Sequence, residues 1–283
     1  MKSPLYPVIK LRKGKDEAVR RHHPWIFSGA IETAAPNLQA GDIVSVVDSK
    51  NEILGTGFAE AGNIAIKILS FSNRKIDNTF WQERLKKAFE LRKMMGLTNN
   101  VSTNCYRLVH SEGDNLPGLI IDIYGKTAVV QAQTEGMALN VKTISDALMT
   151  IEGLDIDSVY NKSSEAMQRM GKDAVEDGYI IGNKSDDFVL ENDSRFLIDW
   201  EEGQKTGFFL DQRNNRELVR QLAKDKTVLN TFCYTGGFSV TALHGGAKKV
   251  VSIDCSKKAI AACEKNISLN GFDINKNPSI AED

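Results

Sequence analysis

The feature that most constrains the fold is a strand, a glycine turn and a second strand ending in a carboxylate. Thr227-Val-Leu-Asn-Thr-Phe232 is a short apolar run typical of a buried strand. It precedes Gly236-Gly237, an apolar segment of helical character, and the strand Lys249-Val-Val-Ser-Ile253, directly before Asp254. This order predicts a β-α-β unit that binds an adenosine-bearing cofactor at the carboxyl ends of parallel strands.

The segments on either side of this unit continue the α/β alternation. Asp211 is a good N-cap for a helix running to about Ala223. Its apolar residues share one face: Leu218, Val219 and Leu222. Ser256 can cap a further helix that closes at Asn270-Gly271. Its expected inward residues are Ile260, Cys263 and Ile267.

Residues 1–73 are rich in strand signals instead. Apolar runs at 42–48, 53–58 and 64–69 follow one another at short spacing, which predicts a small all-β module. Residues 1–35 carry seven Lys and Arg against three Asp and Glu. Such a basic module is compatible with RNA contact, and a solvated charged surface is the equally weighted alternative.

Four residues of this module are candidates for RNA contact: Arg20, Arg21, His23 and Trp25. Arginine can neutralise phosphates, and an aromatic ring can stack on bases. Aromatic residues in a small barrel more often belong to its core.

The middle of the chain, residues 74–200, mixes both kinds of pattern and predicts an α+β domain. We expect a helix over 77–96 and another over 137–150. The expected strands lie at 107–110, 119–124, 128–132, 158–160, 188–190 and 196–198. The remainder, 201–283, then forms the start of a Rossmann-like domain.

The composition is ordinary for a globular protein, with 41% hydrophobic and 26% charged residues. No apolar run has the length of a membrane span, and the N-terminus lacks an apolar signal core, so we expect a cytoplasmic protein without membrane contact. The four cysteines contain no CxxC pair, which fits a reducing compartment. The histidines show no metal-ligand spacing, so we expect no metal.

The glycine pattern discriminates between cofactors. Asp254 lies 17 residues after Gly237, close to the spacing of about 20 at which a carboxylate accepts ribose hydroxyls. A dinucleotide would need a third glycine to seat its pyrophosphate, and bulky Phe238 follows the pair instead. NAD is therefore disfavoured, whereas S-adenosylmethionine has no phosphate and tolerates a looser turn.

Residues 203–216 and 229–239 resemble the ribosomal-RNA large-subunit methyltransferase I family. Residues 23–29, 107–118 and 266–271 carry the same resemblance, which spans almost the whole chain. It implies a PUA domain, which is an RNA-binding β-barrel, then an α+β middle domain and a Rossmann-like methyltransferase domain. It also implies that ribosomal RNA is the partner, S-adenosylmethionine the cofactor and 5-methylcytosine in 23S ribosomal RNA the product.

The resemblance assigns cofactor-binding residues position by position. In this assignment the turn surrounds the methionine part, Asp254 holds the ribose and Asp283 follows the third strand as the adenine-side acid. The turn consists of Thr235, Gly236, Gly237 and Phe238. The signature segment before the first strand is expected to line the same pocket with Phe209, Gln212 and Arg213.

Two catalytic elements of the family have no counterpart in residues 1–283: a DPP-type loop and a later cysteine nucleophile. Cytosine carbon 5 is a poor nucleophile, so a thiolate must first add at carbon 6. Cys233 lies in the turn but is interpreted as a packing residue. We therefore assign no catalytic residue and expect this chain alone to be inactive. The alternative is a non-enzymatic RNA-binding protein that retains the cofactor fold as a scaffold.

The same comparison predicts an open sheet edge. The first strand of this fold is central, and residues 203–283 supply only about three strands. A parallel strand with an open edge is costly and prone to aggregation. We therefore expect either a longer natural protein or coverage by another chain, which leaves a homodimer open.

Overall fold

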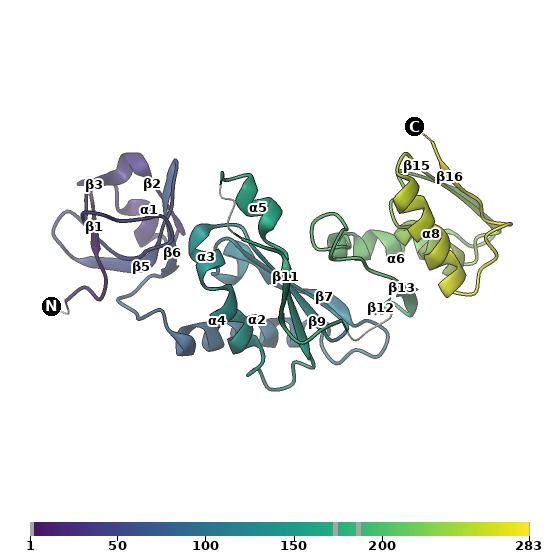
Figure 1. Cartoon of the computed structure of the whole chain (residues 1–283), viewed down its shortest axis with the longest axis horizontal. Coiled ribbons are helices and arrows are strands. Elements are labelled where there is room, and N and C mark those ends of the chain that lie inside the picture. Colours follow the sequence, from purple (N-terminus) through teal and green to yellow (C-terminus); the bar gives the residue numbers. More distant parts are fainter. Residues whose placement is uncertain (1–2, 172–174, 185–187, 283) are drawn as a thin grey trace. The chain divides into compact units, whose positions relative to one another are not determined.

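The computed structural model describes residues 3–171, 175–184 and 188–282. The chain packs as two compact units (Figure 1). The first comprises residues 1–95, 107–122 and 127–184, and the second comprises residues 96–106, 123–126 and 185–283. The finer division into three domains, with boundaries near residues 73 and 200, stays a prediction.

The first unit begins with a six-stranded sheet in the order β2-β6-β5-β4-β1-β3. β1 pairs with β4 in parallel, and all the other neighbouring strands of this sheet pair antiparallel. Its elements are β1 (Val8–Leu11), α1 (Glu17–Arg20), β2 (Trp25–Phe27), η1 (Ser28–Ala30), β3 (Ile31–Ala34), β4 (Ile43–Val47), β5 (Ile53–Ala59) and β6 (Ile64–Ser70). The predicted all-β module is confirmed, and its three apolar runs form β4, β5 and β6.

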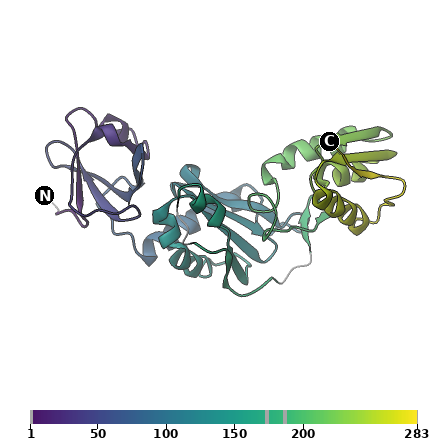
Figure 2. The same cartoon turned by 45° about the horizontal axis from the view of Figure 1, so that its top comes forward.

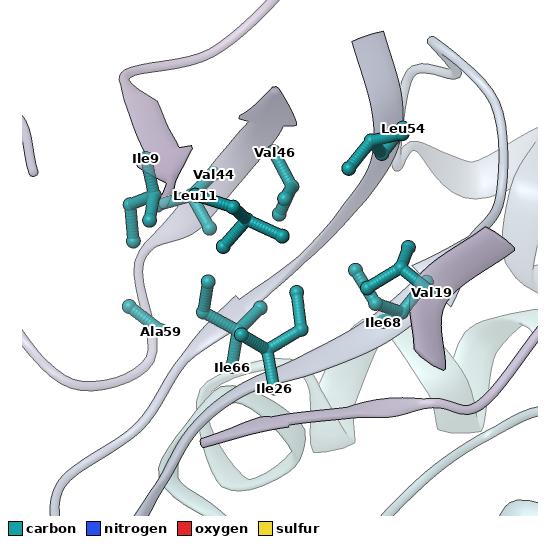
Figure 3. Packing of buried hydrophobic residues seen from close by; sticks show 10 residues of the cluster. All are labelled: Ile9, Leu11, Val19, Ile26, Val44, Val46, Leu54, Ala59, Ile66 and Ile68. Atoms are coloured by element: carbon teal, nitrogen blue, oxygen red, sulfur yellow. The ribbon is translucent and has the colours of Figure 1, made fainter. Parts of the chain in front are cut away.

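Apolar side chains from five strands and α1 meet inside this module (Figure 3). Leu11, Val44, Val46 and Ile66 are fully buried there. Branched side chains on strands that face one another fill a small core well, because they lose little conformational freedom on burial. This packing is what holds the basic module together.

The rest of the first unit is built on a five-stranded sheet in the order β11-β10-β9-β8-β7. Its strands are β7 (Cys105–His110), β8 (Leu119–Tyr124), β9 (Thr127–Ala132), β10 (Ser158–Asn161) and β11 (Gly178–Ile181), and the boundary between the units passes through β7 and β8. Its helices are α2 (Asn78–Met94), η2 (Ser111–Asp114), α3 (Glu135–Leu139), α4 (Val141–Leu148) and α5 (Ser164–Gln168). The single helix expected over 137–150 is thus two helices, which meet at Asn140.

Polar side chains of the motif at residues 107–118 make a cluster of contacts around η2. Asp114 is ion-paired through both carboxylate oxygens with Arg92 of α2, whose side chain is 9% exposed. Trp25 of β2 donates its indole N–H to Glu112 over 2.8 Å. A buried charge must be paired, so these contacts fix η2 against both α2 and the all-β module.

The second unit contains the α/β part of the chain. It consists of β12 (Val189–Glu191), β13 (Ser194–Phe196), η3 (Leu210–Gln212), α6 (Arg213–Leu222), β14 (Thr227–Thr231), α7 (Gly237–His244), β15 (Lys249–Asp254), α8 (Lys257–Leu269) and β16 (Ser279–Ala281). The sheet order is β14-β15-β16, and both pairings are parallel. α8 packs on β15 and β16 (Figure 2), with Ile260, Cys263 and Ile267 buried as predicted. The α/β fold class is confirmed.

Helix α6 differs from its prediction in two ways. A 3-10 turn precedes it, so Asp211 does not cap the helix, and no side chain caps it at Gln212 either. Leu218 and Leu222 are 54% and 66% exposed, while the buried residue is Arg216. The apolar spacing on α6 therefore does not mark the face on which this helix packs.

None of the helices within the described residues is long and apolar enough to cross a membrane.

β14 is an edge strand of the sheet in the part of the chain that the structure describes. Thr227, Leu229 and Thr231 are exposed on it, and Leu229 is 64% exposed. Edge strands with exposed apolar residues are templates for pairing with another polypeptide. The expected open edge is thus present, whereas the prediction of a buried strand at residues 227–232 is wrong, because no residue of β14 is fully buried.

We predict that this chain associates with itself through β14, because exposed backbone groups and Leu229 favour an added strand. Light scattering is expected to give a concentration-dependent mass above the 31.3 kDa of the monomer. Leu229→Lys should reduce the association, because a charge on an edge opposes pairing. The control is Val101→Lys, at a position 94% exposed outside the sheet. A stable wild-type monomer would refute this prediction.

Candidate cofactor site

The candidate site lies at the carboxyl ends of β14 and β15. The turn after β14 runs from Phe232 to Gly236, which is the N-cap of α7. Its backbone is closed by a hydrogen bond of 2.9 Å from Gly236 N–H to the Cys233 carbonyl. Cys233 N–H also donates to the Ile253 carbonyl of β15 over 2.9 Å. The turn is therefore tied to the end of the neighbouring strand.

The Asp254 carboxylate, half-buried at the end of β15, is held by two backbone donors. Tyr234 N–H donates to its Oδ2 over 2.9 Å, and Ser256 N–H donates to its Oδ1 over 3.0 Å. Each oxygen retains acceptor capacity beyond these bonds. Asp254 can therefore accept hydroxyl donors from a ligand while remaining fixed in orientation.

The two glycines of the turn are needed for packing beneath it. Gly236 has φ 81°, and a Cβ there would lie 2.5 Å from the Cys263 Sγ of α8. A Cβ at Gly237 would lie 3.3 Å from Arg216 and 3.5 Å from the Phe208 ring. A side chain at Gly236 would be strained and obstructed. The glycines let the turn sit close to α8 and α6.

One asparagine of α8 connects the turn to the β12–β13 hairpin. Asn266 is fully buried, donates to the Thr235 carbonyl over 2.8 Å and accepts from Leu197 N–H over 2.8 Å. Asn270, one turn later, donates to the Arg195 carbonyl and accepts from its N–H. These paired bonds explain the motif at residues 266–271, because each amide satisfies backbone groups that no strand partner reaches.

The signature segment before β14 contacts the turn through Phe209. Phe209 contacts Tyr234 edge to face, with ring centroids 5.4 Å apart. The Tyr234 hydroxyl accepts from Gln204 N–H over 3.2 Å, and the Lys205 ammonium lies 5.2 Å from the Phe209 ring centroid. The segment is thus pinned beside the turn.

A buried ion pair, which sequence reasoning missed, lies under the same turn. Arg216 is 3% exposed and donates to both oxygens of Glu191, over 2.6 and 2.8 Å. Its guanidinium lies 4.4 Å from the Phe208 ring centroid and 6.0 Å from that of Phe238. The arginine therefore joins the hairpin, the signature segment and α7. The only sequence signal was a second arginine three positions after Arg213.

The structure brings most of the predicted site residues together. Phe209 and the residues of the turn and β15 converge at one end of the sheet, namely Thr235, Gly236, Gly237, Phe238 and Asp254. Gln212 instead bonds its near neighbours in the chain, Asp211 of η3 and Asn215 of α6. Arg213 pairs with Glu191 at 3.3 Å and donates to the Cys105 carbonyl. Asp283 lies outside the described residues. The roles of all these residues in binding stay predictions.

The residues predicted to contact RNA lie in the first unit. Arg20 pairs with Asp16 at 2.5 Å and with Asp48 at 2.7 Å, and Glu52 lies at 3.3 Å. Arg21 is paired with Glu17 alone among the described residues, and its side chain is 72% exposed. Its charge is therefore the more available of the two for an anion.

The rings of this region differ in exposure. Trp25 is half-buried, with its N–H bound to Glu112, while exposed His23 contacts it edge to face. Phe27, two residues further along the edge strand β2, is 52% exposed. Only its exposure, invisible in the sequence, distinguishes it from a core residue.

The site fits the cofactor predicted from the glycine pattern. A fixed carboxylate at the end of β15 suits ribose hydroxyls. A glycine turn without a phosphate-binding third glycine suits a cofactor that has no phosphate.

We predict that Arg216→Ala lowers the free energy of unfolding by about 3–5 kcal/mol, because it leaves the buried Glu191 carboxylate without its bidentate partner. Arg213→Ala serves as the matched control and should cost about 1 kcal/mol, since Glu191 then keeps both bonds to Arg216. Urea unfolding followed by circular dichroism measures both variants. Equal losses in the two would contradict this role of Arg216.

The comparisons with known proteins match both ends of the chain. Residues 9–71 match the PUA-like domain family. Residues 167–282 match the family described as S-adenosylmethionine-dependent methyltransferase. These matches agree with the all-β module and with the α/β unit that carries the candidate site.

Solved structures share the fold. A SAM-dependent methyltransferase from Streptococcus mutans superposes with a TM-score of 0.80 at 23% identity, over 98% of this chain and 70% of its own. A methyltransferase solved in complex with SAH has a TM-score of 0.80 at 23% identity, over 98% of this chain and 69% of its own.

Curated relatives are closer in sequence. The ribosomal RNA large subunit methyltransferase I of Klebsiella pneumoniae (strain 342) is 32% identical, over 100% of this chain and 71% of its own length. The protein of that name from Tolumonas auensis is 36% identical, over 95% of this chain and 68% of its own length. With a PUA-like domain and a methyltransferase domain whose cofactor is S-adenosylmethionine, the chain belongs to the ribosomal RNA large subunit methyltransferase I family.

Proposed function

We propose that this protein methylates ribosomal RNA, with 5-methylcytosine in 23S ribosomal RNA as the product and the cytoplasm as its location. The fixed carboxylate of Asp254 beside the glycine turn is the observation that carries the cofactor half of this proposal. The family relationship and the basic PUA-like module support the RNA half.

In this proposal the residues of this chain bind the cofactor and orient it. S-adenosylmethionine supplies an activated methyl group when bound. Asp254 accepts the ribose hydroxyls, and the turn from Thr235 to Phe238 surrounds the methionine part. Phe209, held against Tyr234, would contact the cofactor beside the turn. Because Arg216 and Asn266 fix this turn from below, little reorganisation is required on binding.

Neither Cys105 nor Cys233 supplies the nucleophile in this proposal. Burial raises the pKa of the Cys105 thiol to about 12. The Cys263 side chain raises the pKa of Cys233, with burial adding to the effect. A thiol must ionise before it can add to cytosine carbon 6. From the family resemblance, we propose that residues 1–283 bind cofactor and RNA, whereas the thiolate and the DPP-type loop come from protein outside them.

The non-enzymatic alternative differs in one measurable respect. A scaffold that only binds RNA has no need of cofactor affinity. Asp254 and its two backbone donors would then be a structural feature of the turn, and the chain would not bind S-adenosylmethionine.

We predict that the chain binds S-adenosylmethionine but not NAD in isothermal titration calorimetry, and that Asp254→Ala weakens the binding about tenfold or more. The variant loses a charged acceptor for the ribose and frees the N–H of Tyr234. The control is Asp273→Ala, which removes a carboxylate after α8 that accepts from Asn275 N–H. Unchanged affinity in a folded Asp254 variant would refute the ribose assignment, and no binding by wild type would favour the scaffold.

We predict that Arg21→Ala weakens binding to a 23S ribosomal RNA fragment and lowers the slope of log K against log salt by about 0.7–0.9, the value for one phosphate contact. Arg20→Ala should change the slope less, because three carboxylates already surround that guanidinium.

The matched control for this RNA experiment is Arg169→Ala. Arg169 is exposed and paired four residues apart with Glu165, just as Arg21 is with Glu17. Filter binding over a salt series measures all three variants. An unaltered slope for Arg21→Ala would exclude this face of the module.

A further inference from the structure

Two free thiols lie together beneath the cofactor turn. Cys233 is in the turn and 5% exposed, and Cys263 is in the middle of α8 and fully buried. Both contact Gly236: its N–H donates to the Cys233 carbonyl, and the Cys263 Sγ packs against its Cα. Each thiol changes the pKa of the other. Gly236 thus lies next to both cysteines.

The surroundings make the two thiols chemically different. The interaction with Cys233 lowers the pKa of Cys263 to about 7, against the opposing effect of burial, and the hydroxyls of Ser279, Ser252 and Ser239 add to the lowering. Ser279 Oγ lies 3.6 Å from the Cys263 sulfur. The pKa of Cys233 is raised by the same partner, by burial and by the Asp254 carboxylate. Cys263 is therefore the sulfur that ionises first, while the Cys233 thiol donates to the Tyr234 carbonyl over 3.6 Å.

The turn that carries Cys233 is strained. Phe232 and Tyr234, on either side of it, have φ of 59° and 49°, and Phe232 is 90% exposed. A residue with a side chain costs on the order of 1–3 kcal/mol in this left-handed conformation. Strain on both sides of Cys233 favours opening of the turn, which would admit a small oxidant and let the two sulfurs approach.

We propose that Cys233 and Cys263 are an oxidation site, at which a peroxide converts them to a disulfide that weakens S-adenosylmethionine binding. The Cys263 thiolate attacks one peroxide oxygen; an S–O bond forms, the O–O bond breaks and hydroxide leaves. Cys233 sulfur then attacks the oxidised Cys263 sulfur, an S–S bond forms, and the oxygen departs as water with the Cys233 proton. Two electrons pass from the sulfurs to the peroxide, and hydroxide takes up the proton that Cys263 had released.

The weaker binding of S-adenosylmethionine rests on the proposed function. It follows from the position of Cys233 in the turn. Drawing its sulfur toward α8 displaces the adjacent Tyr234 N–H, which holds Asp254 Oδ2. The carboxylate would then lose its fixed orientation. Cys255, exposed beside Asp254, is the unpaired thiol against which the pair can be compared.

The test treats the reduced full chain with hydrogen peroxide, alkylates it under denaturing conditions and measures its intact mass. Expected are a loss of about 2 Da before alkylation, and alkylation of only two of the four thiols. Peptide mapping should link Cys233 to Cys263. Cys255→Ser should behave like wild type, whereas Cys233→Ser and Cys263→Ser should form no internal disulfide. Four alkylated thiols, or a linkage through Cys255, would overturn the proposal.

Calorimetry on the same samples tests the consequence. The oxidised chain should bind S-adenosylmethionine about tenfold more weakly, and dithiothreitol should restore the affinity. A Cys233–Cys263 disulfide with unchanged affinity overturns the proposal. Absence of binding by the reduced chain counts against the proposed function, and the mass measurement still decides whether the disulfide forms.

Discussion

The buried pair of Glu191 and Arg216 is the interaction on which the site depends. Both side chains are nearly inaccessible to water, and each satisfies the other through two hydrogen bonds. Because an unpaired buried charge is costly, the hairpin that carries Glu191 and the helix that carries Arg216 must stay together. The guanidinium also lies over the Phe208 ring, and the Arg216 Cδ lies close beneath Gly237, so the pair supports the turn from below.

Further hydrogen bonds hold the rest of the site in place above this ion pair. Asn266 ties the Thr235 carbonyl to the hairpin, and Tyr234 N–H holds the Asp254 carboxylate. A site of this kind binds by preorganisation, since its acceptors are already oriented before a ligand arrives. It also makes the turn sensitive to change from below, where two cysteines contact Gly236.

The sequence predicted where the helices and strands lie better than it predicted which of their faces are buried. Periodic apolar spacing located β14, β15 and α8, and Ser256 caps α8 by accepting from Ala259 N–H. Spacing failed on α6, because it cannot show that a salt bridge would draw Arg216 inward while Leu218 stays exposed. It also failed at Asn140, where one expected helix is two, since local propensity does not report how tertiary packing divides a helix.

The sequence by itself determined the order of strands and helices, the glycine turn and the carboxylate after β15, because these depend on local backbone preference and on short spacings. Only the tertiary structure decided that Arg213 pairs with Glu191, that Arg20 is held by carboxylates and that Cys233 and Cys263 both lie next to Gly236. Each of these contacts joins residues that are distant in the chain, so no local sequence pattern encodes it. Charge pairing and burial are properties of the folded surface and core, and they exist only once the chain has packed.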